Sequence, residues 1–513
     1  MKTVSRDTWK QGLEAFREKT EAFYAGEIDK NAYKGFSGKY GSYAQRGGKA
    51  SMLRLRLTGG ILTKDKLAFI ADSIEEHGIQ RIHITTCQTV QLHDLQPAVI
   101  YQIMEKALDH GIVTMGGGGD YPRNVMMSPL SGVGDGYLDV VPYVEAAGAY
   151  LLNFIEMEKM PRKLKVCFSD SPANVPHATY RDLGFVARPD GKFDVYSAGG
   201  LGANPRFGLK VGERVEPDDI LYYIRAMWQT FRAYGNYENR AKARTRYMQQ
   251  TLGEEGYVEK FKEELEKVYA SGEDLSFSAG QRTVTKTGDG TAAEGGHVIF
   301  QKQEGLYAVH YHPLGGMVKP SKFREIYDAI KDMEQVELRL SPDESIYIIN
   351  LTGGEVRQIE PVLEDGARDL FETSVACIGA GICQVGVRDS QKLLRSVIEA
   401  VRKADLPDGA LPQIHISGCP SSCGTHQTGS IGFRGGVKMI DKVANPSFTM
   451  YVNGCDLQGE EQMGREVGQI LEKDIPKLMV EIGKTVAASG LDYAAWMKEN
   501  EKDFDKIVGK YRV

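Results

Sequence analysis

A strand–helix–strand pattern begins at residue 52. The segment MLRLRLTGG alternates apolar and charged positions, as a half-buried strand does, and it ends in two glycines. The next segment, TKDKLAFIADSIEEHG, starts with a Thr cap and places Leu67, Ile70 and Ile74 on one helical face. RIHITTCQTVQLHD then alternates again. The pattern therefore predicts a strand, a helix and a second strand.

The same pattern recurs at a constant offset of 256 residues, beginning at Tyr307. Gly59 and Gly60 correspond to Gly315 and Gly316. Six apolar positions also match without a gap, in the pairs Leu67 and Phe323, Ile70 and Ile326, Ile74 and Ile330, Ile82 and Leu338, Ile84 and Leu340, and Leu92 and Ile348. The recurrence indicates a tandem duplication in which each half opens with a small α+β unit and continues into a longer domain.

Composition marks the boundaries between these parts. The charged helical start leads into KGFSGKYGSYAQRGGKAS, which predicts an extended arm that packs over another domain. The polar, Gly-rich segment SGEDLSFSAGQRTVTKTGDGTAAEGG predicts the boundary between the halves. The predicted parts are an N-terminal arm at 1–50, a first α+β unit at 51–115, a first longer domain at 116–290, a second α+β unit at 297–366 and a second longer domain at 367–513.

The composition is that of a folded enzyme. Of the 513 residues, 42% are hydrophobic and 26% are charged. The first segment carries charges throughout instead of the apolar stretch of a secretory signal, and no window approaches the ~18 consecutive apolar residues of a membrane span. The net charge of -6 argues against a general nucleic-acid binder. These features predict a cytoplasmic protein with no membrane or nucleic-acid partner.

Four of the seven cysteines lie within 47 residues, at Cys377, Cys383, Cys419 and Cys423. Their spacing is C-x5-C followed by C-x3-C, and the first pair is too wide for an ordinary zinc ribbon. Four thiolates among glycines suit an iron–sulfur cluster, whose inorganic sulfides need room and backbone amides. The other three, Cys87, Cys167 and Cys455, have no partner at a useful spacing and are interpreted as small buried side chains.

The segments ACIGAGICQVG and ISGCPSSCG resemble the [4Fe–4S] and sirohaem signature of sulfite reductase haemoproteins and ferredoxin-dependent nitrite reductases. The resemblance runs from YAQR in the arm to the cysteine pairs, and the duplication matches the plan of that family. It implies an α+β fold with two ferredoxin-like half-domains and two sirohaem-type α/β domains. It also implies that the four clustered cysteines ligate a [4Fe–4S] cluster and that Cys423 is shared with the sirohaem iron.

Reduction of sulfite to sulfide, or of nitrite to ammonia, takes six electrons and several protons onto one small anion. Such a site needs a ring of cations that binds the anion and delivers protons. By the resemblance, the catalytic candidates are Arg54 in MLRLRL, Arg123 in YPRNVMM, and Lys163 and Lys165 in MPRKLKV. The two lysines alternate along a strand-like segment and therefore point to one face.

The second lysine of the K-x-K pair bears on the substrate. In the family, the nitrite-reducing branch commonly has Asn at this position, whereas the sulfite-reducing branch has Lys. Lys165 therefore favours sulfite, a dianion that gains more from an extra cation than nitrite does. The segment THQTGSIGF is closer to the nitrite-reducing relatives. Sulfite reduction is the leading hypothesis, and nitrite reduction is the alternative.

Sirohaem carries many carboxylates, so its pocket needs cations and amide donors. The resemblance suggests six cofactor-binding residues, Gln88, Gln91, His93, Arg162, Arg240 and Arg244. His93 is equally well interpreted as a core histidine. The chain departs from the family at Cys87, where an Arg is usual, and at Ser430, where an acid is common. Either another cation compensates for the missing arginine, or cofactor binding differs locally.

No G-x-G-x-x-G turn follows a strand and opens a helix, so the sequence offers no nicotinamide or flavin site. The electrons are therefore expected from a separate protein. A small acidic ferredoxin is the leading donor and a flavoprotein subunit is the alternative. A non-catalytic iron–sulfur electron-transfer module would also explain the cysteines, but it gives no reason for the four candidate cations.

Overall fold

The computed structural model describes residues 5–157, 159–280 and 282–513. The chain forms two compact units. The first comprises Met1–Gly200, Pro205–Tyr311 and Val318–Glu364, and the second comprises Leu201–Asn204, His312–Met317 and Asp365–Val513. Within the described part of the chain, none of the helices combines the length and the apolarity that a bilayer crossing requires.

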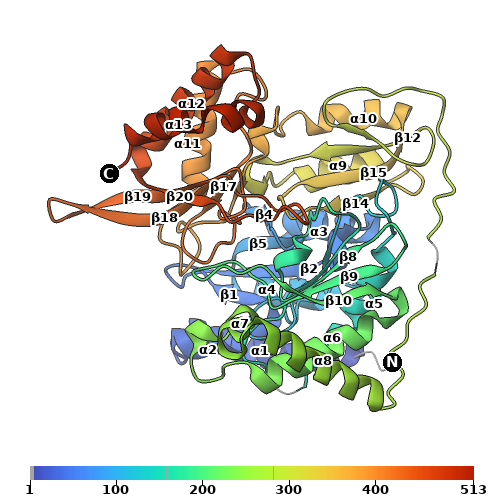
Figure 1. Ribbon diagram of the computed structural model, residues 1–513. Coiled ribbons are helices and arrows are strands. Elements are labelled where there is room, and N and C mark those ends of the chain that lie inside the picture. The colour runs from blue at the N-terminus through green and yellow to red at the C-terminus, as the bar shows by residue number, and fades with distance from the viewer. Residues whose placement is uncertain (1–4, 158, 281) are drawn as a thin grey trace. The chain divides into compact units, whose positions relative to one another are not determined.

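Two five-stranded sheets of the first unit share one hydrophobic core (Figure 1). The first sheet has the order β1 (Ser42–Ala44), β2 (Ser51–Arg56), β5 (Thr89–Leu95), β4 (Ile82–Ile84) and β13 (Met317–Val318), with helices α3 (Lys64–Glu76) and α4 (Pro97–Ala107). The second has the order β11 (Val298–Phe300), β12 (Leu306–Tyr311), β15 (Ile346–Thr352), β14 (Glu337–Leu340) and β3 (Ile61–Leu62), with helices α9 (Lys322–Ile330) and α10 (Gly353–Leu363).

The predicted duplication is confirmed, and the two copies exchange a strand. β3 follows the first copy's twin glycine but pairs with β14 of the second copy, and β13 joins the first sheet in return. Gly59 and Gly315 have φ of 64° and 61°, so both turns need a residue that tolerates the left-handed region. The twin glycines therefore redirect the chain from one sheet toward the other.

Two sequence predictions differ from the structure. RIHITTCQTVQLHD forms two strands, β4 and β5, because a turn closes at residues 85–88, where Gln88 has φ of 52°. This turn contains no Gly or Pro, so the alternating pattern runs through it unbroken. The predicted extended arm contains helix α2 (Lys30–Ser37), which Asp29 caps, after helix α1 (Arg6–Tyr24). Residues 1–4 of that arm lie outside the described residues.

A third sheet lies in the first unit, with the order β10 (Leu209–Val215), β9 (Phe193–Ser197), β8 (Leu183–Ala187), β7 (Val166–Ser169) and β6 (Met126–Met127). β6, β7 and β8 are parallel, and the other pairs are antiparallel. Its core is completed by α5 (Val141–Leu152), α6 (Ile220–Tyr234), α7 (Met248–Leu252) and α8 (Glu254–Ala270).

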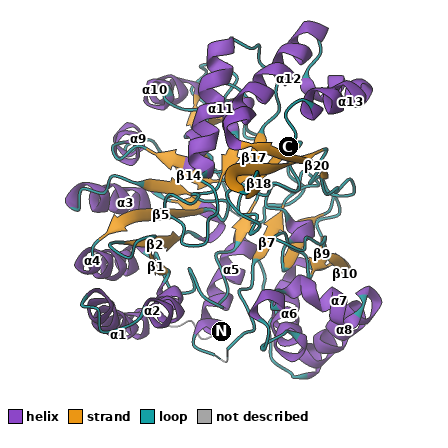
Figure 2. Cartoon of the chain, turned by 90° about the vertical axis from the view of Figure 1, so that its left-hand side faces the viewer, coloured by secondary structure: helices purple, strands orange, loops and turns teal. Residues whose placement is uncertain are grey.

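The second unit repeats this topology around its own core. Its sheet has the order β16 (Val375–Ala376), β17 (Ile414–Ser417), β18 (Ile431–Ile440), β19 (Val443–Val452) and β20 (Arg465–Leu471). β16, β17 and β18 are parallel, and the remaining pairs are antiparallel. Helices α11 (Ser390–Ala404), α12 (Ile475–Ser489) and α13 (Tyr493–Gly509) gather on one side of this sheet (Figures 1 and 2). The longer domain is therefore duplicated as well as the small α+β unit.

Substituting Gly432 in β18 with alanine is expected to destabilise the second unit. A Cβ there would meet the His426 carbonyl oxygen at 1.8 Å, which the backbone must move to relieve. We expect a loss of about 3 kcal/mol in the free energy of unfolding, measured by thermal denaturation. Gly436→Ala in the same strand is the control, because its nearest atom would be 3.8 Å away. Equal stability of the two variants would contradict this packing.

Candidate metal centre and anion site

The four clustered cysteines lie in the second unit, at one edge of its sheet. Cys377 directly follows β16, and Cys419 lies two residues beyond the end of β17. Because β16 and β17 are parallel neighbours, their carboxyl ends meet at the same edge. Cys383 and Cys423 lie in the loops that continue from these strands. The topology therefore brings together the two cysteine pairs of the sequence motif.

The sulfur of Cys377 is held by polar groups. Its Sγ accepts a hydrogen bond from the Gly418 N–H at 3.2 Å and lies 3.2 Å from Ser390 Oγ at the start of α11. Burial, together with nearby Cys423, raises the pKa of Cys377 to about 12. The protein alone therefore keeps this thiol protonated, and metal binding would displace its proton. N–H donors to sulfur are the contacts that tune iron–sulfur clusters.

The number of cysteines suits a four-iron cluster. Among the described residues, no three His, Cys, Asp or Glu side chains are arranged to hold one ion. A four-iron cluster does not require such convergence, because each iron takes its own cysteine. His426, three residues after Cys423, is fully buried, and neither ring nitrogen has a hydrogen-bond partner in the described part of the chain. This orphaned histidine fits a site that a further group completes.

The catalytic candidates lie in the first unit. Arg54 is in β2, Arg123 precedes β6, and the two lysines precede β7. Arg54 Nη1 donates to the Gly117 carbonyl, and Arg123 donates to the same carbonyl and to that of Gly119, both at 2.7 Å. The shared carbonyl therefore brings the two guanidinium groups together.

The two lysines flank Leu164, which pairs with Pro122 in an extended bridge, so both side chains point to one face. Lys165 Nζ donates to Cys87 Sγ at 3.3 Å. Burial alone would raise the pKa of Cys87, but Lys165, with other cations, lowers it to about 6. Cys87 therefore lies among cations that favour its thiolate form.

Three of the predicted cofactor-binding residues are paired with acids that the sequence did not single out. Arg162 Nη1 donates to Asp120 Oδ1 at 2.6 Å, and Arg240 donates to both oxygens of Asp120 at 2.5 and 3.1 Å. Arg244 Nη2 lies 3.1 Å from both oxygens of the fully buried Asp182. These pairs hold the guanidinium groups in place while leaving other N–H groups to bind an anion.

The other three cofactor candidates lie around the β4–β5 hairpin. Gln91, with its carboxamide oxygen facing Arg54, accepts from Nη2 at 2.6 Å and from Nε at 3.1 Å. Gln88 donates to the Met127 and Leu340 carbonyls and accepts from the Met127 N–H, which gives it a structural role. His93 is buried, and desolvation lowers its pKa to about 3, so it is neutral.

Among the described residues, several buried guanidinium N–H groups lack acceptors, and an anionic cofactor would supply them. Arg123 Nε, Arg181 Nη2 and Arg244 Nε are buried and have no acceptor in the described part of the chain. An unpaired buried donor is costly, and charge-assisted bonds to carboxylates would satisfy it. The cluster therefore fits a group rich in carboxylates together with a small oxyanion.

Sequence reasoning missed two arginines of this region. Arg56 is buried in β2 and donates to the Met115 carbonyl at 2.8 Å and to the Arg123 carbonyl at 3.1 Å. It lies two positions from Arg54 in MLRLRL, so the alternation that marked Arg54 could have indicated it. Arg181 is brought near Cys87 only by the tertiary fold, and no local motif marks it.

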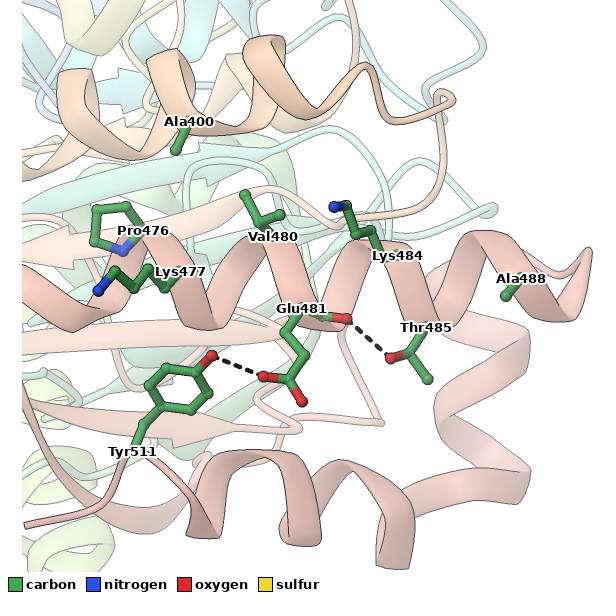
Figure 3. A pocket seen from close by; sticks show the side chains of 9 residues that line it. All are labelled: Ala400, Pro476, Lys477, Val480, Glu481, Lys484, Thr485, Ala488 and Tyr511. Atoms are coloured by element: carbon green, nitrogen blue, oxygen red, sulfur yellow. Dashed lines mark hydrogen bonds between the residues drawn. The ribbon is translucent and has the colours of Figure 1, made fainter.

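A surface pocket of the second unit lies away from the cysteine motif in sequence. Figure 3 shows its lining on α11 and α12 and at Tyr511, with residues Ala400, Pro476, Lys477, Val480, Glu481, Lys484, Thr485, Ala488 and Tyr511. Tyr511 donates to Glu481 Oε2 at 2.7 Å. None of the predicted site residues lines this pocket.

The first copy of the longer domain lacks the cluster cysteines. The Ser128 N–H donates to the Phe168 carbonyl just as the Cys377 N–H donates to the Ile416 carbonyl, which makes Ser128 the counterpart of Cys377. The loop after β7 reads SDSPANVPHATY where the loop after β17 reads SGCPSSCGTHQT. Only the second copy therefore carries the cysteine constellation.

Two family models match the first half of the chain. "Nitrite/Sulfite reductase ferredoxin-like half domain" matches residues 43–110, and "Nitrite and sulphite reductase 4Fe-4S domain" matches residues 118–269. The second match covers the copy without the four clustered cysteines. The matches define a redox enzyme with the duplicated plan that the structure shows.

Curated relatives agree with this class, and a solved structure has the same fold. The chain is 26% identical to "Sulfite reductase [ferredoxin] 1" of Mycolicibacterium paratuberculosis over 82% of this chain and 76% of that protein. It is 28% identical to the chloroplastic "Ferredoxin--nitrite reductase" of Oryza sativa subsp. japonica over 75% and 66%. The fold is that of the Mycobacterium tuberculosis NirA protein, with a TM-score of 0.78, 23% identity and 98% coverage of both chains. The chain is therefore similar to ferredoxin-dependent nitrite and sulfite reductases over most of its length.

Proposed function

We propose that the protein reduces sulfite to sulfide with electrons from a ferredoxin. The observation that carries this function is the cation cluster of the first unit, in which Arg54 and Arg123 share one carbonyl beside Lys165. A cluster with unpaired guanidinium donors binds an oxyanion, and its lysines supply protons.

Each catalytic candidate has a distinct task in this proposal. Arg54 and Arg123 clamp the oxygens of the substrate with their planar forks, because the glycine carbonyls fix both guanidinium groups. Lys163 and Lys165 face the same side and hold the protons that the departing oxygens require. Arg162, Arg240 and Arg244, with Gln91, bind carboxylates of the sirohaem. His93 completes the set of proposed cofactor contacts, whereas the bonds of Gln88 position the turn that carries Cys87.

In this proposal, the cysteines of the second unit bind the iron–sulfur cluster that passes electrons to the substrate site. Cys377, Cys383, Cys419 and Cys423 would ligate the [4Fe–4S] cluster, and Cys423 would be shared with the sirohaem iron. When bound, the two groups would supply single electrons in sequence. The names of several relatives support a ferredoxin donor, and we also propose a cytoplasmic location.

Nitrite is the second candidate substrate. The relative from Oryza sativa and one from Zea mays are both named ferredoxin–nitrite reductases, and each is 28% identical to this chain. Turnover of the holoenzyme with reduced ferredoxin and each anion, measured as sulfide or ammonia formed, tests both. Sulfite reduction at the higher kcat/KM is expected, and failure to form sulfide would overturn the proposal.

Lys165→Asn is expected to shift the preference of the enzyme toward nitrite. Sulfite carries more negative charge than nitrite near neutral pH, so it loses more when a cation is removed. We expect the sulfite-to-nitrite ratio of kcat/KM to fall by about tenfold, equivalent to about 1.4 kcal/mol of differential binding. Lys192→Asn, which removes a cation at an exposed ion pair of the same unit, is the control. An unchanged ratio in Lys165→Asn would remove the charge argument for sulfite.

A further inference from the structure

The sulfur of Cys87 is held in place by its own backbone. Cys87 lies in the turn between β4 and β5, where its N–H donates to Thr85 Oγ1 at 3.2 Å. Its carbonyl accepts from Asn124 Nδ2 at 3.1 Å. Both peptide groups of this residue are therefore fixed, and the thiol keeps a constant position beside Lys165.

The groups around this thiol are cationic or apolar. Cations act on it from four elements, namely Lys163 and Lys165 before β7, Arg181 after η5 (Ala178–Tyr180), Arg54 in β2 and Arg123 before β6. Its apolar neighbourhood consists of Met126, Cys167, Ala178, Val186 and Tyr196. Asp182, which acts on the neighbouring Cys167, accepts from the Lys165 N–H at 2.8 Å and is also bound by Arg244 and Thr245.

One of these cations, Arg181, has a donor to spare for an anion. Arg181 is 91% buried and donates through Nε to the Pro176 carbonyl at 3.1 Å, but its Nη2 has no partner in the described residues. Lys165 Nζ donates to Cys87 Sγ and so contacts the thiol directly. An oxyanion that enters here competes with the thiolate for the same positive charge.

Cys167 shows that proximity to these cations is not enough to ionise a thiol. It is fully buried in β7 and also lies near Arg181 and Lys165, yet burial raises its pKa to about 12. Cys87 is only half-buried and has a direct contact to an ammonium group. The two cysteines therefore provide a matched pair within the same cluster, one with a lowered thiol pKa and one with a raised thiol pKa.

We propose that Cys87 takes up a proton when the substrate anion binds beside Lys165 and returns it through Lys165 during reduction. This inference rests on the proposed function of the site.

Before substrate binds, a Cys87 thiolate faces the Lys165 ammonium. The arriving anion replaces the thiolate as the partner of Lys165, and the thiolate gains a proton from water. Lys165 then gives one N–H proton to a substrate oxygen, and the Cys87 S–H proton moves to the resulting amine. The ammonium and thiolate are restored, so charge and protons balance. Cys87 acts through Lys165 and is a positioning residue.

Nitrite binding to the oxidised holoenzyme, without an electron donor, tests this coupling. Nitrite keeps one charge near neutral pH, whereas sulfite changes its own protonation there. We expect the dissociation constant, followed by the sirohaem absorption, to rise as the pH is raised above about 6, by up to about tenfold per pH unit. Cys87→Ser keeps a hydrogen-bonding group but cannot ionise, so its affinity loses this dependence. Cys167→Ser should retain it.

An infrared measurement of the S–H stretch gives a readout that a merely structural role would not change. In the difference between wild type and Cys87→Ser, the band should be absent at pH 8 and should appear when nitrite is added. A band present before nitrite is added, or no change on binding, would overturn the proposal. If sulfite is still reduced in that case, only this inference fails. If neither anion binds or is reduced, the proposed function fails as well. In that case the S–H band measured without nitrite still shows whether Cys87 is protonated.

Discussion

Cys423→Ser is expected to abolish sulfite reduction while leaving the protein folded. Cys423 is exposed in the loop after β17 and contributes nothing to the core of the second unit, so the substitution should leave the melting temperature nearly unchanged. A serine oxygen is a much poorer iron ligand than a thiolate, and this position is proposed to serve two metal centres. Sulfide formation should fall to background, and the magnetic coupling between cluster and sirohaem should be lost from the EPR spectrum.

The matched control is Cys455→Ser. Cys455 is a half-buried cysteine of the same unit that lies outside the C-x5-C and C-x3-C pairs, so its loss should leave turnover and the EPR spectrum unchanged. Undiminished coupling in Cys423→Ser would show that this sulfur is not the shared ligand. Loss of activity in both variants would indicate a general effect of removing a thiol from the second unit.

Arg54→Met is expected to lower kcat/KM for sulfite by about 10²–10³-fold. The loss of one preorganised charge that is aimed at an oxyanion typically has this effect. Arg54 is half-buried and retains the neighbouring Arg123 on the same Gly117 carbonyl, so we expect the fold to survive. Steady-state kinetics with reduced ferredoxin would measure the effect, and circular dichroism would check folding.

Arg81→Met provides the comparison for Arg54→Met. Arg81 lies just before β4 in the same sheet, but its partner is Asp94 at 3.2 Å in an exposed ion pair. Exposed pairs contribute little, so kcat/KM should stay within about twofold of wild type. Equal losses in the two variants would mean that Arg54 acts through the general charge of the unit and not as a substrate ligand.

The periodic elements could be predicted from the sequence because their signals are local. Thr63 caps α3 as predicted and accepts from the Lys66 N–H, and the twin glycines recur in two turns of the same conformation. The exchange of β3 and β13 between the sheets had no such signal. Each strand has two residues, too few to show alternation, and its partner is distant in the sequence. Such pairing is fixed by tertiary packing.

Site residues that belong to a local sequence motif could be predicted. Site residues that are brought together only by the tertiary fold could not. The cysteine spacing and the K-x-K pair are local, and the family resemblance gave them roles. Asp120, Asp182 and Arg181 are joined to the candidate residues only through contacts distant in sequence. The lowered pKa of the Cys87 thiol depends on those contacts, so the position of Cys87 in the sequence could not reveal it.

Absorption and EPR spectra of the anaerobically purified protein, before and after addition of sulfite, show directly whether both redox groups are present and coupled. We expect a sirohaem-type Soret band and red band that shift with sulfite, together with a [4Fe–4S] signal coupled to the haem iron. An intact cluster with no tetrapyrrole, in protein produced with sufficient sirohaem, would contradict this expectation and would favour a non-catalytic electron-transfer module.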